Sequence, residues 1–554
     1  MFLFDVFRSF LPLHNPIGFG PADFIELALA AMLVLMALVW RPWIQPYALK
    51  LAERTGWSML LLALLPVVLR LALLAHHPVP SPDVYDEFGH LLQADTLRHF
   101  RLANPPHPLP QFFETFFVLQ EPTYSSIYPV GQGLALALGW AVFGLPWAGV
   151  VLSVAAFCAL CYWMLRAWTT PGWALAGGLL AVAEFGPLSQ WMNSYWGGAF
   201  AAAAGCLVFG ALPRLRNGPR TRDAVLLGVG LGMHLLTRPY ESIFLFLGVV
   251  LFFVPDPRKL ARVAPDVVLV LIPAVAIMLF QNKAVTGSWT TLPEMASQYQ
   301  YGVPAALTFE SNPVPHRLLT REQALDYKMQ LSFHTGPETV RSYLERLEYR
   351  VRYYRFFFLA PLYLALVVFL VTIREFRFVW VVLTLLLFSL GVNFFPAFQL
   401  HYIAAVTGLF VLVSVTGLER IGGAAARLIV FLCVAHFIFW YGLHVFDDSE
   451  VSMAMRPYET WDAINHGNPE RRIYVNRQLA QIPGKLLVFV RYYPQHVFQD
   501  EWVYNAADID GARVVWARDL GEAEDEKLRS YYPGRAVWLL EPDFQPPRLT
   551  AYQR

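Results

Sequence analysis

Charged residues are scarce in this chain. Only 15% of its 554 residues are charged, whereas 56% are hydrophobic, and soluble domains carry about 25% charged residues. The formal net charge is +1, so the composition offers no basic surface for nucleic acid and predicts no nucleic-acid partner. This shortage of charge predicts that membrane lipid, rather than water, surrounds most of the chain.

Cysteine is also rare, and its positions exclude a disulfide framework. The four cysteines, Cys158, Cys161, Cys206 and Cys433, all fall inside apolar runs, where a thiol packs as a small apolar side chain. A redox or metal role for the Cys158-x-x-Cys161 pair is the less favoured interpretation, because no polar residues adjoin it. The first long apolar run, 27–40, lacks a basic segment before it and a small-residue cleavage site after it, so we expect no cleavable signal.

Long apolar runs separated by short polar breaks fill most of the sequence. A helix needs about 20 mostly apolar residues to cross a hydrocarbon core of about 30 Å. We therefore predict a mostly α-helical, polytopic transmembrane bundle with about 12 spans. The candidate spans are residues 24–40, 57–75, 148–166, 172–188, 198–212, 223–238, 240–254, 265–281, 356–373, 378–393, 401–418 and 428–446.

Basic residues between these runs predict which loops are cytoplasmic. Short loops rich in Lys and Arg lie on the cytoplasmic side of a membrane, and such loops stand at 41–54, 214–222, 258–262 and 374–377. They share one side only if the apolar segment 129–145 makes no full crossing, so we interpret it as a re-entrant or membrane-surface helix. The segments then predicted to share the extracytoplasmic side are 76–128, 189–197, 282–355 and 447–554.

The C-terminal part, residues 447–554, has a different pattern. Its apolar runs, 486–490, 514–516 and 537–540, are short and rich in Val and Leu, and a helix-like stretch, 522–531, separates the last two. This alternation predicts a small extracytoplasmic α/β domain after a transmembrane domain over 1–446. It lacks a glycine-rich phosphate loop, so we expect it to pack over the loops or to contact an acceptor rather than to bind a nucleotide.

An acidic pair follows the second predicted span. The proline-rich stretch 78–82 leads to Asp86 and Glu87, at the start of an amphipathic segment that extends to Phe100 and is typical of an interfacial helix. A helix cap explains such a pair by itself. The functional interpretation is a general base, because a carboxylate is ionised at neutral pH and accepts protons better where an apolar boundary raises its pKa.

The order of short motifs resembles one family of membrane enzymes. After the acidic pair come Tyr128-Pro129-x-Gly131-x-Gly133, Asn193-Ser194-Tyr195-Trp196-Gly197-Gly198, Thr237-Arg238-Pro239 and His401-Tyr402. This ordered set, spread over residues 57–418, resembles the C-type (GT-C) glycosyltransferases. Protein O-mannosyltransferases and the lipid A aminoarabinose transferase belong to that superfamily.

The resemblance implies transfer of a sugar from a polyprenyl-linked donor to an extracytoplasmic glycan, lipid or protein, at a bacterial plasma membrane. By position, Asp86 matches the family's catalytic acidic residue and would deprotonate the acceptor hydroxyl for inverting attack. Glu87 would orient the acceptor or, as in some relatives, help a divalent cation. Residue spacing marks no metal site, but an acidic pair serves a base and an ion equally well. Metal dependence, the sugar, the carrier and the acceptor therefore stay open.

One position departs from the family's pattern. Many relatives carry a Lys immediately before the Tyr-Pro element, where this chain has Ile127. A leaving phosphate needs a facing cation, and Arg238 is the candidate because it joins two short apolar segments and a guanidinium binds phosphate in a bidentate fork. A structural pair between Arg238 and Glu241 stays equally open, with Arg98 and Arg101 as fallback cations.

Aromatic and histidine residues on the same predicted side are candidate substrate contacts. Tyr128 begins the Tyr-Pro-x-Gly-x-Gly motif. Tyr195 is a candidate to stack on a sugar ring, although aromatic residues are also common at membrane interfaces. His90, His401 and Tyr402 lack the spacing of a metal site, so structural or acceptor-binding roles are favoured.

Two other function classes stay open. A transporter or flippase of lipid-linked solutes would carry ionisable residues at the bilayer midplane and show two related halves. The acidic residues gather instead at one predicted surface and the sequence shows no repeat, which disfavours transport. A noncatalytic membrane protein with the same fold is kept open by Ile127.

Overall fold

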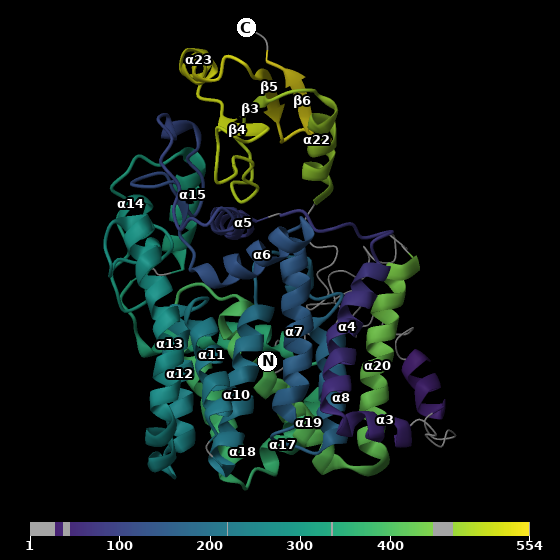
Figure 1. Ribbon diagram of the computed structural model, residues 1–554. Coiled ribbons are helices and arrows are strands. Elements are labelled where there is room, and N and C mark those ends of the chain that lie inside the picture. The colour runs from purple at the N-terminus through teal and green to yellow at the C-terminus, as the bar shows by residue number, and fades with distance from the viewer. Residues whose placement is uncertain are drawn as a thin grey trace.

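The computed structural model describes residues 28–36, 45–82, 84–218, 220–333, 336–446 and 469–552. These residues form a bundle of long helices with a small sheet over one end (Figure 1). The predicted span 24–40 lies partly outside the described ranges, which hold a helix over 28–36 in that region.

Six helical segments among the described residues are long and apolar enough to cross a membrane. They are α4 (Thr55–Ala72), α7 (Trp147–Leu165), α10 (Ala199–Asn217), α13 (Pro257–Thr286), η3 (Leu400–Val406) with α19 (Thr407–Ile421), and α20 (Gly423–Phe446). Shorter helices occupy the other predicted positions: α8 (Pro171–Phe185), α11 (Thr221–Leu235), α12 (Pro239–Phe253), α17 (Leu362–Val371) and α18 (Phe376–Val392). The mostly helical membrane bundle is confirmed, whereas the count of about 12 spans is not.

The segment predicted not to cross forms α6 (Val130–Phe143). It lies across the end of the bundle that carries the sheet (Figure 1), and it packs on α7 and on α5 (Tyr85–Arg98). The backbone turns at Gly144, whose φ of 72° suits glycine, before α7 begins. This position agrees with the interpretation of 129–145 as a helix that does not run through the bundle.

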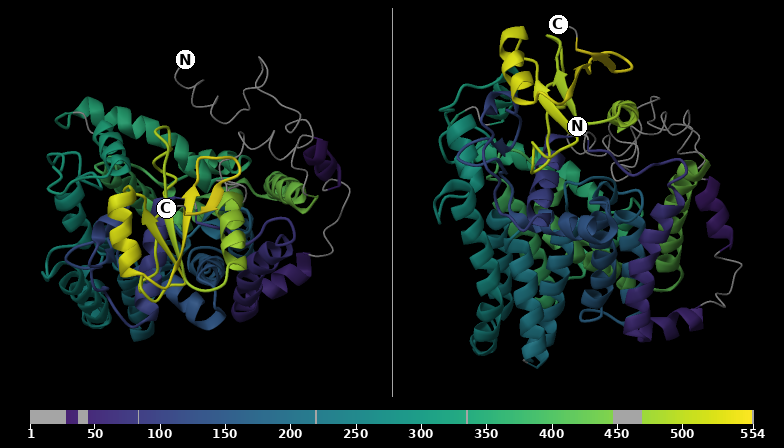
Figure 2. Two further views of the ribbon diagram at one scale, coloured as in Figure 1. Left: turned by 90° about the horizontal axis from the view of Figure 1, so that it is seen from above. Right: turned by 45° about the horizontal axis from the view of Figure 1, so that its top comes forward.

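The two ends of the bundle carry different segments. At one end the basic loops meet: Lys259 donates a hydrogen bond to the backbone oxygen of Arg216 at 2.7 Å, and Arg377 donates one to that of Trp168 at 3.2 Å. At the other end lie α5 and the long loop after α13, beneath the sheet (Figures 1 and 2). The segments therefore group as the charge distribution predicts.

Short elements make up the loops at the sheet end. They are η1 (Pro110–Phe112), β1 (Val118–Leu119), β2 (Ser125–Ser126), α9 (Gln190–Asn193), α14 (Pro293–Tyr301), α15 (Arg321–Ser332), α16 (Val340–Val351) and η2 (Arg352–Phe357). The opposite end carries α3 (Gln45–Glu53).

The C-terminal sheet has four strands in the order β4-β3-β5-β6. β3 (Leu486–Val490) pairs in parallel with β4 (Val514–Arg518) and β5 (Ala536–Glu541), and β6 (Arg548–Ala551) pairs antiparallel with β5. The helices α22 (Pro469–Gln481) and α23 (Glu522–Tyr531) lie on opposite sides of the strands (Figures 1 and 2). The predicted strands and the helix at 522–531 are confirmed, while the proposed boundary at 446/447 adjoins residues 447–468, outside the described ranges.

The sheet shares its packing with the first loop. Phe88 of α5 stacks on Tyr504 with ring centroids 4.2 Å apart, and Asp95 accepts a hydrogen bond from the backbone N–H of Ala507 at 2.8 Å. The polar face expected for α5 is therefore not exposed: Gln93 and Asp95 are buried. The polar face expected for an amphipathic interfacial helix is therefore not open to water, because α6 and the C-terminal segment cover α5.

A buried arginine ties the sheet to the second loop. Arg518 of β4 forms an ion pair with Glu322 of α15 at 2.6 Å and another with Glu501, and it donates a hydrogen bond to the backbone oxygen of Glu114. Because a buried charge is costly without partners, this network favours one fixed position of the sheet over the loops.

Candidate functional site

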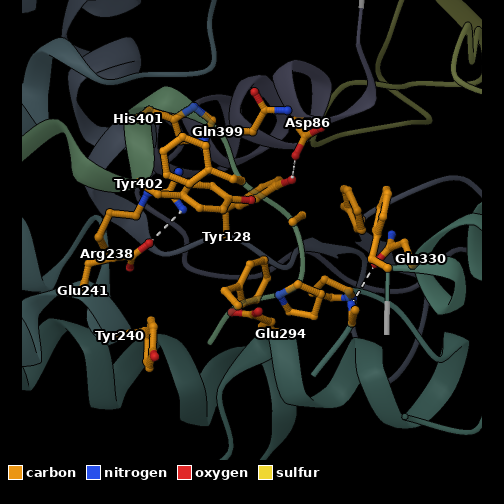
Figure 3. Close-up of a pocket in the computed structure, with 18 of the residues that line it drawn as sticks. Asp86, Tyr128, Arg238, Tyr240, Glu241, Glu294, Gln330, Gln399, His401 and Tyr402 are labelled. Atoms are coloured by element: carbon orange, nitrogen blue, oxygen red, sulfur yellow. Dashed lines mark hydrogen bonds and ion pairs between the residues drawn. The ribbon is translucent and has the colours of Figure 1, made fainter. Parts of the chain in front are cut away.

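A cavity of about 1240 Å³ lies between the bundle and the loops at the sheet end. Figure 3 shows part of its wall. Most of the site residues predicted from the sequence line it, namely Asp86, His90, Tyr128, Arg238, Glu241, His401 and Tyr402. The folding of the chain thus brings together α5, the start of α6, the junction of α11 and α12, and η3. Glu87 and Tyr195 are not part of this lining.

Asp86 presents its carboxylate to the cavity from the first turn of α5. The Tyr128 hydroxyl donates a hydrogen bond to this carboxylate (Figure 3). Enclosure away from water raises the pKa of Asp86 above its ordinary value, whereas the hydrogen bonds from Tyr128 and Trp196 and the charge of Arg238 act in the opposite direction. A carboxylate in such surroundings is a stronger proton acceptor than one in water.

The glycine motif after Tyr128 explains how these groups meet. A Cβ on Gly131 would lie 2.9 Å from the backbone of Leu236, and the Gly131 N–H donates a hydrogen bond to the Leu236 carbonyl at 2.7 Å. A Cβ on Gly133 would lie 2.5 Å from Gln93 of α5. Both glycines therefore permit close packing, which sets the end of α11, and with it Arg238, beside α5 and Asp86.

Arg238 lies where α11 gives way to α12. Its guanidinium is 3.7 Å from the Glu241 carboxylate and 4.5 Å from the centroid of the Tyr402 ring. The contact with Glu241 is an ion pair longer than a hydrogen bond, and the Arg238 side chain keeps 24% of its surface exposed toward the cavity. The ion pair with Glu241 and the binding of a phosphate by Arg238 are therefore compatible, because the pair leaves N–H donors of the guanidinium available.

Glu294 of α14 is a site residue whose role the sequence did not reveal. It lines the same cavity (Figure 3). Burial raises the pKa of Glu294 to about 7, with a further contribution from the charge of Glu241, while Arg238 lowers it. The charges of Glu241 and Arg238 thus both act on Glu294. Nothing in the sequence near Glu294 indicates this electrostatic effect, because Glu241 and Glu294 lie on different helices.

The histidines of the cavity pack against aromatic rings. Burial, together with Arg238, lowers the pKa of His90 to about 3, so its ring is neutral and stacks on Tyr128 at 4.2 Å. His401 packs against Trp196 at 5.2 Å. Among the described residues, no group of three or more His, Cys, Asp or Glu side chains is close enough to hold a metal ion.

Glu87 and Tyr195 hold the local structure instead of facing the cavity. The carboxylate of Glu87 accepts hydrogen bonds from the backbone N–H groups of Val84 and Tyr195, at 3.1 and 2.8 Å. The Tyr195 hydroxyl donates to the carbonyl of Pro80 at 2.9 Å. We therefore assign Glu87 to fixing the start of α5 beside the motif at 193–198. This position leaves Glu87 poorly placed to orient an acceptor or to bind a cation.

Glu87→Ala should destabilise the protein. It leaves one buried and one partly buried backbone donor without their carboxylate, which costs about 3 kcal/mol. Thermal unfolding in detergent should show a clear fall in the midpoint. The matched control is Glu121→Ala, because the Glu121 side chain is 59% exposed in its pair with Arg317 and surface pairs contribute about 1 kcal/mol or less. Equal unfolding midpoints for the two variants would contradict the structural role of Glu87.

The fallback cations lie outside the cavity lining. Arg98 pairs with Asp95 at 2.8 Å and covers the Trp140 ring at 4.3 Å. Neither Arg98 nor Arg101 is among the lining residues. Ile127 does line the cavity, so the position at which many relatives carry Lys faces this space without a charge.

Comparison with solved structures finds other proteins with a similar fold. ArnT from Cupriavidus metallidurans in the apo state matches with a TM-score of 0.52 and 12% identity, over 88% of this chain and 93% of that chain. The same protein bound to undecaprenyl phosphate matches with a TM-score of 0.49 and 12% identity, over 88% and 93%. The archaeal oligosaccharyltransferase AglB from Archaeoglobus fulgidus, in complex with an inhibitory peptide and a dolichol-phosphate, matches with a TM-score of 0.42 and 13% identity, over 90% and 70%.

The comparisons with protein-family models and with curated proteins find no match. The likeness to apo ArnT therefore concerns the fold, and it confirms the GT-C resemblance that the sequence motifs indicate. The assignment of individual residues depends on the cavity of this chain itself.

Proposed function

We propose that this chain is a membrane glycosyltransferase that moves a sugar from a polyprenyl-phosphate-type donor to an extracytoplasmic acceptor. The observation that carries the proposal is that Asp86 and Arg238 line one cavity. Asp86 supplies a base and Arg238 a cation for a leaving phosphate. ArnT, whose fold this chain shares, has been solved with undecaprenyl phosphate, which makes polyprenyl phosphates the first donor class to test.

In the proposed reaction, the acceptor hydroxyl oxygen attacks the anomeric carbon of the donor sugar. Asp86 takes the hydroxyl proton, and the bond from the anomeric carbon to the phosphate oxygen breaks with inversion. Arg238 stabilises the negative charge that develops on the leaving phosphate. One base and one cation suffice, because a lipid phosphate is already a good leaving group.

The proposed side of the membrane follows from charge. The basic loops gather at the end of the bundle opposite the cavity, and such loops are cytoplasmic in most membrane proteins. We therefore propose that the cavity and the C-terminal sheet are extracytoplasmic, in a bacterial plasma membrane. Glu87 has both oxygens on backbone donors, so the proposal gives Glu87 no part in holding a cation.

The proposal is tested with purified protein in nanodiscs. A panel of sugars linked to undecaprenyl phosphate is supplied with an extract of envelope lipids and glycans, and release of undecaprenyl phosphate is measured. We expect release with at least one donor, dependent on the acceptor extract and on Asp86. No binding of undecaprenyl phosphate and no release from any donor would contradict the proposed function.

Donor binding should depend on pH through Glu294. Below about pH 7 its carboxyl group is neutral, and above that pH it becomes a second anion beside Arg238. In the unchanged protein, the affinity for undecaprenyl phosphate should therefore fall between about pH 6 and pH 8. The fall should be about fivefold larger than that measured with Glu294→Gln over the same pH range. Measuring the Kd of undecaprenyl phosphate for both proteins corrects for ionisation of the phosphate itself. Parallel pH curves would exclude this role of Glu294.

A further inference from the structure

A row of aromatic rings leads away from Arg238 along the cavity wall. It begins at Tyr402, whose ring lies 4.5 Å from the guanidinium. The ring centroids of successive members, Tyr402 to Phe398, Phe398 to Tyr353 and Tyr353 to Tyr349, are 6.3, 5.8 and 5.7 Å apart. All four rings line the cavity, and Tyr349, the last, is 53% exposed. The row therefore joins the cation to the rim of the cavity.

Two other arginines whose side chains line the cavity near the row, Arg346 and Arg350, have partners. Both Glu338 oxygens accept hydrogen bonds from Arg346 at 2.9 Å. Arg350 donates hydrogen bonds to backbone carbonyls at the end of α18, among them those of Val392 and Pro396. These guanidinium groups are therefore engaged in holding the wall, and beyond Arg238 the row offers mainly ring faces to a ligand.

The helix α16, which carries Tyr349, has two different faces. With 3.6 residues per turn, Ser342, Arg346 and Tyr349 share one face, and they line the cavity. The opposite face carries an apolar stripe of Val340, Leu344, Leu347 and Val351. Val340, Leu344 and Val351 are 78, 54 and 50% exposed. The helix thus turns this apolar stripe outward and the face with Ser342, Arg346 and Tyr349 toward the cavity.

The position of α16 explains this arrangement. Tyr343 donates a hydrogen bond to the carbonyl of Leu390 at 2.7 Å and Arg346 one to that of Asn393 at 2.7 Å, so α16 sits on the end of α18. The 17 residues of α18 span about 26 Å, close to the thickness of a hydrocarbon core. Leu383, Leu386 and Leu390 are exposed along α18, and the stripe on α16 continues this apolar surface.

The direction of α16 agrees with a place at the membrane boundary. The chain bends by 115° between residues 340–357 and α17. α17 packs along α19, and η3 with α19 is long enough to cross a membrane. A helix inclined this far from α17 would lie close to the plane of the membrane surface, with its stripe in the acyl chains, as interfacial helices do.

We propose that the aromatic row is the track of the donor's prenyl chain, and that α16 forms the lipid-side rim where the chain leaves the cavity. This inference rests on the proposed function. A donor with its phosphate at Arg238 must pass its apolar chain back to the bilayer, and the row provides a continuous apolar surface from the guanidinium outward. Burial of the chain against ring faces adds affinity that a bare phosphate lacks.

Direct binding tests the track. The probes are undecaprenyl phosphate and the much shorter geranyl phosphate, titrated onto the full chain in nanodiscs. The double variant Tyr349→Ala/Tyr353→Ala should weaken undecaprenyl phosphate binding by about tenfold and leave geranyl phosphate binding unchanged. Tyr299→Ala is the control, because Tyr299 is 63% exposed in the same loop but outside the cavity lining.

The outcomes separate the two proposals. If the unchanged protein binds undecaprenyl phosphate tightly and the double variant binds it equally well, the track is overturned. The proposed function then still stands. Equal losses for the long and the short probe also overturn it, since they indicate a damaged phosphate site. No binding of either probe by the unchanged protein overturns the donor class, and the track with it.

A labelling experiment tests the rim without any substrate. The four native cysteines are buried, so a fluorophore reacts selectively at Leu344→Cys. Spin-labelled lipids should quench this fluorophore at least twofold more than one at Leu318→Cys, an apolar position that is 95% exposed on the loop before α15. Equal quenching at the two sites would overturn the placement of α16 in lipid.

Discussion

Asp86→Asn should lower kcat/KM for sugar transfer by about a thousandfold. An amide keeps the shape of the side chain and still accepts the hydrogen bond from Tyr128, but it does not take a proton from the acceptor. The Kd for undecaprenyl phosphate should change by no more than about twofold, because the contact proposed for the phosphate is Arg238. Transfer kinetics and direct binding, measured on one preparation, separate the two effects.

The matched control for Asp86 is Glu345→Gln. Glu345 also lines the cavity, but its carboxylate pairs with Arg341 at 2.8 Å. Removing that charge should leave kcat/KM within about twofold. Full activity of Asp86→Asn, or an equal loss in both variants, would contradict the assignment of Asp86 as the base.

Arg238→Ala should raise the Kd for undecaprenyl phosphate by about a hundredfold. The loss is that of a charge-assisted, forked contact, for which about 3 kcal/mol is typical. Arg238→Lys should recover only part of it, since an ammonium keeps the charge but lacks the fork. Calorimetry or fluorescence titration of the nanodisc-embedded protein measures both variants.

Arg238→Ala also leaves Glu241 without its cation, so folding needs its own control. The double variant Arg238→Ala/Glu241→Gln removes the unpaired buried charge and should unfold near the temperature of the unchanged protein. If this stable double variant binds undecaprenyl phosphate as tightly as the unchanged protein does, the phosphate site lies elsewhere.

The sequence predicts the elements with a strong period or composition. Apolar runs located the bundle helices, and runs of Val and Leu located β3, β4 and β5. The span count is harder to predict, because short helices such as α11 and α17 have lengths that cores and membranes share. The edge strand β6, at Arg548–Ala551, was not predicted from the sequence, because an exposed strand needs no apolar run.

The candidate site was partly predictable for a different reason. Asp86, Arg238 and Tyr402 belong to short motifs, and the fold then placed all three on one cavity wall. Glu87 looked equivalent to Asp86 in the sequence, yet adjacent residues on a helix point in different directions. Which of them faces the cavity depends on the backbone N–H groups of Val84 and Tyr195, which hold Glu87.

Long-range contacts account for what the sequence did not reveal. The burial of α5 beneath the C-terminal segment involves the stacking of Phe88 on Tyr504. The position of the sheet over the loops involves the ion pair between Arg518 and Glu322. Each contact joins residues that are far apart along the chain, and neither partner carries a local signal for the other. The electrostatic effect of Glu241 on the pKa of Glu294 also joins residues that are far apart along the chain.

The most direct test is an electron-microscopy map of Asp86→Asn with undecaprenyl phosphate in nanodiscs. We expect phosphate density within hydrogen-bonding distance of the Arg238 guanidinium, facing residue 86 across the cavity. Phosphate density outside this cavity, or a residue 86 side chain turned away from the bound lipid, would contradict it.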